Sequence, residues 1–245
     1  MKKLVLIFFI LLIPSCTQNY NWGWYILNPR LDSGFSNLQF LLSGLSITIS
    51  ISLLSIFFSL LIGFFVSLLG MSPTKIFIWI NRFYIEIFRS VPLLVLLLWV
   101  YYGLPVIFGI SFGPFVAGIM SLAISDSAFE AEIFRAGLQS INKGQRDAAK
   151  SIGLNKYQEM RFIILPQALR IILPAIGNQF VYVLKMSSLV SIIGLADLTR
   201  KANELVVSVY RPLEVYTFLV LEYLILILII SFFVRKLEKK LKTNL

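Results

Sequence analysis

Long stretches without any charged residue limit what this chain can fold into more than any other feature. No charged residue occurs between Asp32 and Lys75, and none occurs between Arg89 and Asp126. A bilayer core of about 30 Å is crossed by about 20 apolar residues in a helix. Of the 245 residues, 58% are hydrophobic and 14% are charged, whereas a soluble domain has about 25% charged residues. The sequence therefore predicts an all-α integral membrane protein and excludes a soluble enzyme.

We predict five membrane spans. The first covers about residues 40–69, and the fourth and fifth cover about residues 163–184 and 215–234. The second charge-free stretch divides into two spans at a turn rich in glycine and proline. The residues of this turn are Gly103, Pro105, Gly109, Gly113 and Pro114. The predicted organisation is a leader and N-terminal segment at 1–39, a transmembrane domain at 40–237 with a large loop at about 139–161, and a basic tail at 238–245.

The distribution of lysine and arginine predicts the orientation of the chain in the membrane. The loop after the third span and the C-terminal tail are both basic, and basic residues collect on cytoplasmic loops. An even number of crossings separates these two segments, so we expect both in the cytoplasm and the N-terminal segment outside it. The net charge of +10 then reflects membrane topology, and we expect lipid and no nucleic acid as a partner.

The N-terminus has the pattern of a short leader. Lys2 and Lys3 precede an apolar run at residues 4–13 that is too short to span comfortably. The residues before Cys16 loosely resemble a lipoprotein processing site, although Pro14 departs from its usual small residues. Cleavage with lipidation of Cys16 and an uncleaved anchor with an inert Cys16 both remain open.

Two absences narrow the chemistry. The sequence has no histidine and a single cysteine, which excludes histidine-based catalysis, histidine-ligated metals and an internal disulfide. It also lacks the G-x-x-x-x-G-K-[ST] loop that binds ATP phosphates. We therefore expect no catalytic residue, no metal and no cofactor in this chain.

The large loop has the features of a rigid docking helix. Ala148 and Ala149 are small and would let another surface approach closely, and Gly153 supplies a helix stop. Pro166 follows in the first turn of the next helix, where proline is tolerated. A solvated loop helix without a partner is the alternative.

The same loop resembles the EAA loop of ABC importer permeases. The match consists of Asp147, Ala148, Ala149 and Gly153 at fixed gaps, followed by Ile163, Leu165 and Pro166, with Gly144 just before. Asp147 replaces the usual glutamate and keeps its charge. The resemblance implies that this loop is a coupling helix seated on a separate ATP-binding subunit, which holds the ATP and magnesium.

Further segments are similar to permeases for polar amino acids. They cover residues 84–94, 130–137, 165–168 and 185–189, with Met186 where this group often has aspartate. The resemblance implies a five-span permease in the inner membrane that works with a second permease copy or paralogue and an extracytoplasmic solute-binding protein. An ion-coupled secondary transporter and a structural membrane subunit of another complex are the alternatives.

Several charged residues are expected at membrane depth. Arg82, Glu86 and Arg89 share one helical face, and their alternating signs predict an ion-pair ladder with a structural role in preference to substrate contact. Glu132 and Arg135 are expected to pair on another face.

Asp126 and Glu130 are expected to behave differently, because like charges four residues apart on a helix repel each other. We predict that Asp126, with or without Glu130, faces the translocation path and favours a cationic amino acid. The alternative is that Lys185 neutralises one of them. The candidate substrate path also includes Ser187 and Ser188.

Overall fold

The computed structural model describes residues 20–242, and no strand occurs among them. The α-helices are α2 (Asp32–Leu42), α3 (Gly44–Gly70), α4 (Lys75–Ser90), α5 (Leu93–Leu98), α6 (Leu104–Phe108), α7 (Pro114–Gln139), α8 (Lys143–Ser151), α9 (Lys156–Gln158), α10 (Leu165–Met186), α11 (Leu198–Val209) and α12 (Pro212–Lys242). The shorter elements are the 3-10 helices η1 (Trp24–Leu27) and η4 (Ser187–Ile193) and the π-helical η2 (Trp99–Gly103) and η3 (Glu159–Ile164). The predicted leader and Cys16 lie outside the described residues.

Three helical stretches of the described chain are long and apolar enough to cross a membrane: Asp32–Gly70, Lys156–Ile193 and Pro212–Leu241. A fourth is formed if α4 and the helix that runs from α5 to α6 count as one span with a 98° bend. The long helix α7 is not among them, because acidic and basic side chains interrupt its apolar sequence. The five predicted spans correspond in order to α3, the helix that runs from α5 to α6, α7, α10 and α12. Helix α4 precedes the second of these spans, and the number of crossings stays a prediction.

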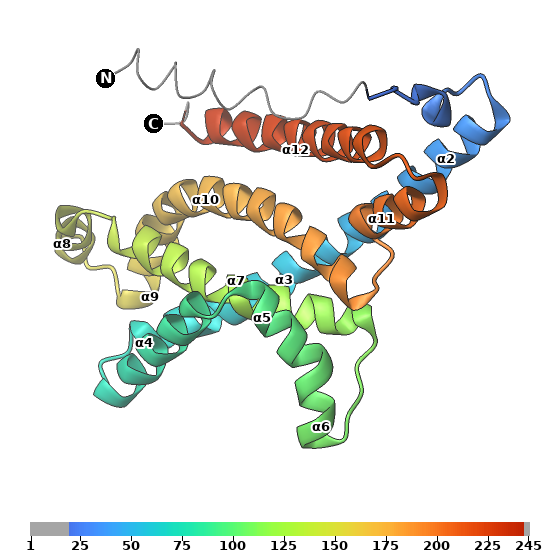
Figure 1. Ribbon diagram of the computed structural model, residues 1–245. Coiled ribbons are helices and arrows are strands. Elements are labelled where there is room, and N and C mark those ends of the chain that lie inside the picture. The colour runs from blue at the N-terminus through green and yellow to red at the C-terminus, as the bar shows by residue number, and fades with distance from the viewer. Residues whose placement is uncertain (1–19, 243–245) are drawn as a thin grey trace, which may run out of the picture.

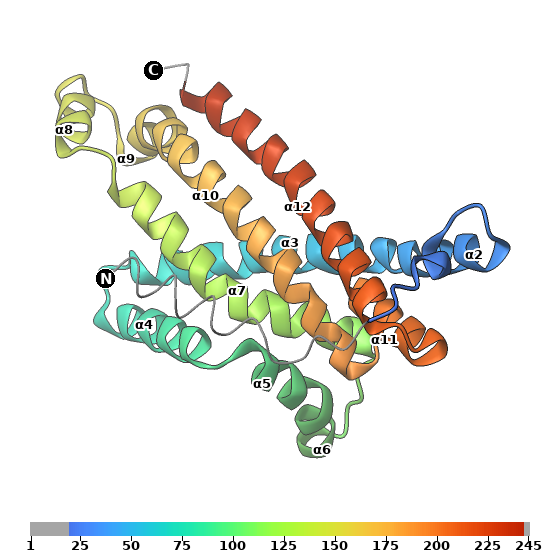
Figure 2. The same cartoon turned by 45° about the horizontal axis from the view of Figure 1, so that its top comes forward.

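The helices give the molecule two distinct ends. Helices α8 and α9, the beginning of α4 and the end of α12 lie together at one end, and α2 and α11 lie at the other (Figures 1 and 2). We use the name coupling loop for the large loop at about residues 139–161. We call the end that carries it the coupling-loop end and the other the opposite end. The long helices α3, α7, α10 and α12 run between the two ends (Figure 2).

Helices α3 and α7 form the most extensive helix pair of the described chain. The face of α3 that meets α7 carries small side chains about one turn apart, and all of them are buried: Thr48, Ser52, Ser55, Ser59 and Gly63. Lipid tails are as apolar as leucine, so helices in a membrane associate chiefly by close packing, which small residues allow. The two helices approach closely at Gly63, where a Cβ atom would stand 2.6 Å from Cβ of Glu130.

The second helical unit is bent because a proline interrupts it. Pro92 follows the end of α4 and precedes α5, and the residue before a proline is pushed to extended backbone, as Val91 is here. Helix α4 buries only Asn81 and Ile85. The amide of Asn81 donates a hydrogen bond of 2.7 Å to the carbonyl of Val66 on α3, so α4 leans on α3 and leaves most of its surface free.

Buried carboxylates organise the opposite end. Asp197 caps α11 by accepting from the backbone N–H of Arg200. The N–H of Leu198, the first residue of α11, donates to the hydroxyl of Thr48 on α3. Glu214 at the start of α12 is fully buried and accepts hydrogen bonds from the hydroxyl of Tyr20 and the N–H of Gly23. These contacts fix the N-terminal segment and α11 against the spanning helices.

The close approach at Gly63 predicts a loss of stability on Gly63→Ala. The added methyl would meet Cβ of Glu130 and, at 2.9 Å, the carbonyl oxygen of Ser127, so α3 and α7 must separate. Overpacking of this kind costs about 1–3 kcal/mol. We expect a lower unfolding temperature for the purified protein in detergent.

Gly113→Ala is the matched control, because a Cβ at Gly113 meets nothing within 4 Å and its φ of −63° suits alanine. An unfolding temperature for Gly63→Ala equal to that of Gly113→Ala would contradict the tight packing of α3 on α7.

Candidate coupling loop and intramembrane charges

Local capping explains how the coupling loop begins and ends. The side chain of Asn142 caps α8 by accepting from the N–H of Gly144 at 2.9 Å. At the other end Gly153 has a φ of +81°, a left-handed conformation that glycine adopts without strain. Its N–H bonds to the carbonyl of Lys150, and the N–H of Leu154 bonds to the carbonyl of Ala149. The sequence prediction of a helix stop at Gly153 is therefore confirmed.

The loop returns to the membrane through a second capped turn. Asn155 and Gln158 form a reciprocal capping box at the start of α9. The chain then continues through the π-helical η3 into α10, with Pro166 in its first turn. No interruption separates α9 from α10, so the loop is continuous with the fourth predicted span.

One side of α8 packs on its own chain. Ala149 is 2% exposed, and the guanidinium of Arg146 donates to the carbonyl of Leu138 near the end of α7. Ala149 is thus unable to present its side chain to another subunit, contrary to what the resemblance implies for this residue. Its small size serves the packing of α8 against the membrane helices.

The other side of the loop is free. Asp147 and Ala148 are exposed, and the one ion pair of Asp147 within the described chain is with Lys150 of the same helix at 3.9 Å. Two large apolar side chains stand beside them: Ile152 is 73% exposed and Tyr157 is 67% exposed. Sequence reasoning missed these two, although an isoleucine and a tyrosine in an otherwise polar loop were the available signal. Leu165 is 40% exposed and lies at the start of α10.

Asp126 lies in the interior of the helix bundle. It is 3% exposed and accepts hydrogen bonds of 2.5 Å from the hydroxyl of Ser59 on α3 and from the amide of Gln179 on α10. The carboxylate therefore joins three helices. Sequence reasoning missed both partners. The regular spacing of serines in α3 was the available signal for Ser59, and no sequence signal indicated Gln179.

Glu130 is fully buried one turn further along α7. Within the part of the chain that the structure describes, neither of its carboxyl oxygens has a hydrogen-bond partner. The alternative that Lys185 neutralises Asp126 or Glu130 is not realised among the described contacts, and Lys185 is exposed.

The two serines of the candidate path are satisfied locally. Ser187 donates to the carbonyl of Leu184, and Ser188 donates to the carbonyl of Lys185. Both hydroxyls thus bond the last turn of α10. The structure brings Asp126 and Glu130 together in the α3–α7–α10 interface and places Lys185, Ser187 and Ser188 near the junction of α10 and η4.

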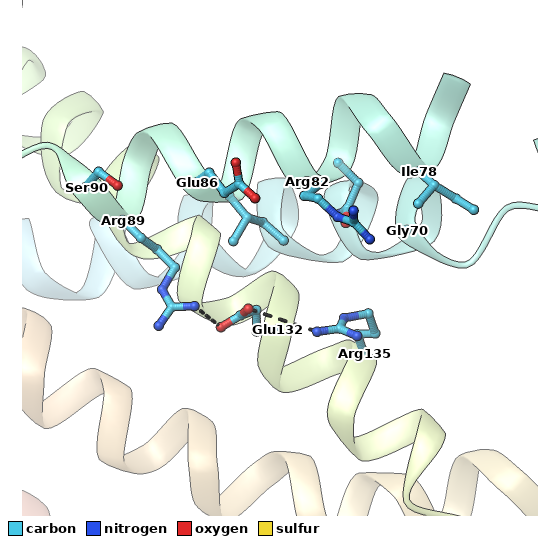
Figure 3. A pocket seen from close by; sticks show the side chains of 10 residues that line it. Gly70, Ile78, Arg82, Glu86, Arg89, Ser90, Glu132 and Arg135 are labelled. Atoms are coloured by element: carbon cyan, nitrogen blue, oxygen red, sulfur yellow. Dashed lines mark hydrogen bonds and ion pairs between the residues drawn. The ribbon is translucent and has the colours of Figure 1, made fainter. Parts of the chain in front are cut away.

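A cavity of about 580 Å³ lies between α4 and α7, and charged side chains line it (Figure 3). Glu132 on α7 forms an ion pair of 2.5 Å with Arg89 on α4 and a longer one of 4.0 Å with Arg135 one turn away. The guanidinium of Arg89 also stands 5.2 Å from the centre of the Phe129 ring. The pairing of Glu132 with Arg135 agrees with the sequence, but Arg89 reaches across to a different helix.

The predicted ladder along α4 is wrong. Neither Arg82 nor Glu86 has a hydrogen bond or ion pair within residues 20–242. Arg89 turns to Glu132 because that carboxylate faces it across the α4–α7 groove (Figure 3). In addition, a cation placed four residues before an anion is the less favourable order on a helix.

Comparison with known proteins places these features in a family. Residues 59–243 match the family described as the binding-protein-dependent transport system inner membrane component. The arginine transport system permease protein ArtQ of Bacillus subtilis is 37% identical over 218 residues, which are 89% of this chain and 100% of that protein. The glutamine transport system permease protein GlnP of Escherichia coli is 38% identical over 65% of this chain and 73% of its own length.

A solved structure agrees with the sequence relatives. The crystal structure of an amino acid ABC transporter with histidines contains a chain that is 38% identical to this one and superposes with a TM-score of 0.82. The match covers 90% of this chain and 100% of that chain. Membership of such a complex implies an ATP-binding subunit and a binding protein as partners. The chain belongs to the family of inner membrane components of binding-protein-dependent transport systems, as a non-catalytic, multi-pass permease subunit of the ABC importer type.

Proposed function

We propose that this chain forms the translocation path for a polar amino acid, delivered by an extracytoplasmic binding protein and moved at the expense of ATP on a separate subunit. The observation that carries the proposal is the near-complete match to an arginine permease and to a chain of an amino acid ABC transporter. The sequence has no phosphate-binding loop, in keeping with ATP and magnesium on the partner. Uptake of labelled glutamine or arginine by proteoliposomes tests it, and uptake that persists without ATP would contradict it.

The proposed orientation puts the coupling-loop end in the cytoplasm. Helices α8 and α9 and the end of α12 lie at this end (Figure 1), and their sequences are basic, as expected of cytoplasmic segments. The aromatic side chains of Tyr20, Trp22, Trp24 and Tyr25 then lie at the outer membrane–water interface, where tyrosine and tryptophan are enriched. The five crossings, the leader at 1–39, the permease core at 40–237 and a second permease copy or paralogue belong to the same proposal.

The free side of the coupling loop is the proposed contact with the ATP-binding subunit. Asp147 and Ala148 offer an exposed strip, and Ile152 and Tyr157 add large apolar side chains on either side of the turn at Gly153. Exposed apolar groups with a polar rim mark protein interaction sites. Because α8 is fastened to α7 and the loop is continuous with α10, movement of the partner would reach both helices without loss in a flexible linker.

This surface predicts that Ile152→Ser weakens assembly. The side chain is exposed and makes no packing contribution to its own chain's core, so folding should be unaffected while the apolar contact with the ATP-binding subunit is lost. An anchor residue of an interface is worth about 1–2 kcal/mol or more. We expect at least a fivefold lower yield of ATP-binding subunit on co-purification, and reduced uptake.

Val207→Ser is the matched control, since Val207 is 68% exposed on α11 at the opposite end. Its substitution should leave co-purification unchanged. Equal yields for Ile152→Ser and Val207→Ser would show that the apolar side chain at position 152 does not contact the ATP-binding subunit.

We infer that Asp126 ties α3, α7 and α10 together in the resting permease. Asp126→Asn replaces a carboxylate that accepts from Ser59 and Gln179 by an amide with one acceptor oxygen, and hydrogen bonds to charged groups are worth about 1.5–3 kcal/mol. We expect a lower unfolding temperature and an unchanged ratio of arginine to glutamine uptake.

The hypothesis from sequence, in which Asp126 faces the path and favours a cationic amino acid, expects the reverse outcome. A fall in arginine uptake relative to glutamine at an unchanged unfolding temperature would favour it. Ser121→Ala on the same helix controls for the loss of a buried polar group, because the Ser121 hydroxyl donates to the carbonyl of Ala117 in its own helix and has no other partner among the described residues.

A further inference from the structure

The cavity between α4 and α7 is lined by charged side chains, and two of them belong neither to its ion pairs nor to the coupling loop. Three arginines and two glutamates line it, together with the hydroxyl of Ser90. Glu132 is engaged with Arg89 and Arg135. Arg82 and Glu86 remain, one cation and one anion, each without a partner in the described chain.

Arg82 and Glu86 lie one turn apart on α4, and both line the cavity. Residues four apart on a helix have Cβ atoms about 5–6 Å apart on the same face. Figure 3 shows both side chains extending from α4, with the Glu86 carboxylate and the Arg82 guanidinium apart from each other. A volume of about 580 Å³ lies within the range of about 300–1,000 Å³ of small-molecule sites.

The surface of helix α4 is divided into three faces: one packed on the bundle, one exposed and apolar, and one charged. Asn81 and Ile85 pack on the bundle, while Ile76, Ile80 and Phe83 form an exposed apolar face that suits lipid. The charged side chains lie between these two faces, at the groove with α7. Burying an unpaired charge in a membrane is costly, so such charges face water or a functional cavity. Arg82 and Glu86 face the cavity between α4 and α7.

We propose that this cavity binds the zwitterionic head of an amino acid, with Arg82 on the carboxylate and Glu86 on the ammonium group, at the coupling-loop side of the bundle. The site rests on the proposed function, because it takes the same cargo. Both ligand charges are met by free side chains of opposite sign, so binding does not break the ion pairs of Glu132. The cargo side chain then occupies the remaining volume of the groove.

The test uses the complex of the permease with its ATP-binding subunit, without binding protein, in nanodiscs of phosphatidylethanolamine and phosphatidylglycerol. Binding of L-glutamine is compared with that of N-acetyl-L-glutamine, which lacks the ammonium group, and of L-glutaminamide, which lacks the carboxylate. We expect the native protein to prefer L-glutamine by about tenfold or more over either analogue, since each loses one charge-assisted contact.

The variants assign each contact. Arg82→Gln should abolish the preference over L-glutaminamide and keep the preference over N-acetyl-L-glutamine, and Glu86→Gln should do the opposite. Lys75→Gln is the control: this exposed cation lies on the same helix and does not line the cavity, so both preferences should persist.

Equal binding of all three ligands to the native complex would overturn the site, whatever the variants do. The site would also be overturned if Arg82→Gln and Glu86→Gln each lowered the affinity for all three ligands by the same factor. It would be overturned as well if either variant converted the assembly to complexes with a single permease copy, because the charges would then belong to an interface between copies. ATP-dependent uptake with the binding protein is measured in parallel. If uptake is intact while the charge preferences are absent, the site fails and the transport function stands.

Discussion

Close packing of α3 on α7 is the constraint on which the rest of the structure depends. The small residues of α3 let the two backbones approach, and Gly63 leaves no room for a methyl group. Because the helices are so close, Ser59 reaches Asp126, and Gln179 joins them from α10. These two donors offset part of the cost of burying the Asp126 carboxyl group.

The sequence was sufficient wherever the structure depends on local chemistry. Gly153, just after α8, adopts the left-handed conformation that a helix stop requires, and Pro166 lies in a first turn, as expected. The order of helical units also follows from charge-free stretches and turn residues. These features depend on neighbours in the chain, and helical periodicity and backbone preferences describe such neighbours well.

Contacts between helices were beyond the same reasoning. Spacing along α4 identified Glu86 as the neighbour of Arg82 and Arg89, but the structure pairs Arg89 with Glu132 of α7. Ala149 was expected at a partner surface and is instead buried against its own chain. A helical face can be predicted from periodicity, whereas which element covers that face depends on how the bundle packs. A single sequence does not contain that information in readable form.

The two functional regions are joined by one rigid element. Helix α7 carries Glu132 beside the charged cavity and ends at Gln139, three residues before the cap of α8 at Asn142. Arg146 then fastens α8 back to the carbonyl of Leu138. A displacement of the coupling loop would therefore move Glu132, and with it Arg89 of α4. The wall of the cavity would change shape as α8 moves, so the proposed contact of α8 with the ATP-binding subunit would be mechanically connected to the groove between α4 and α7.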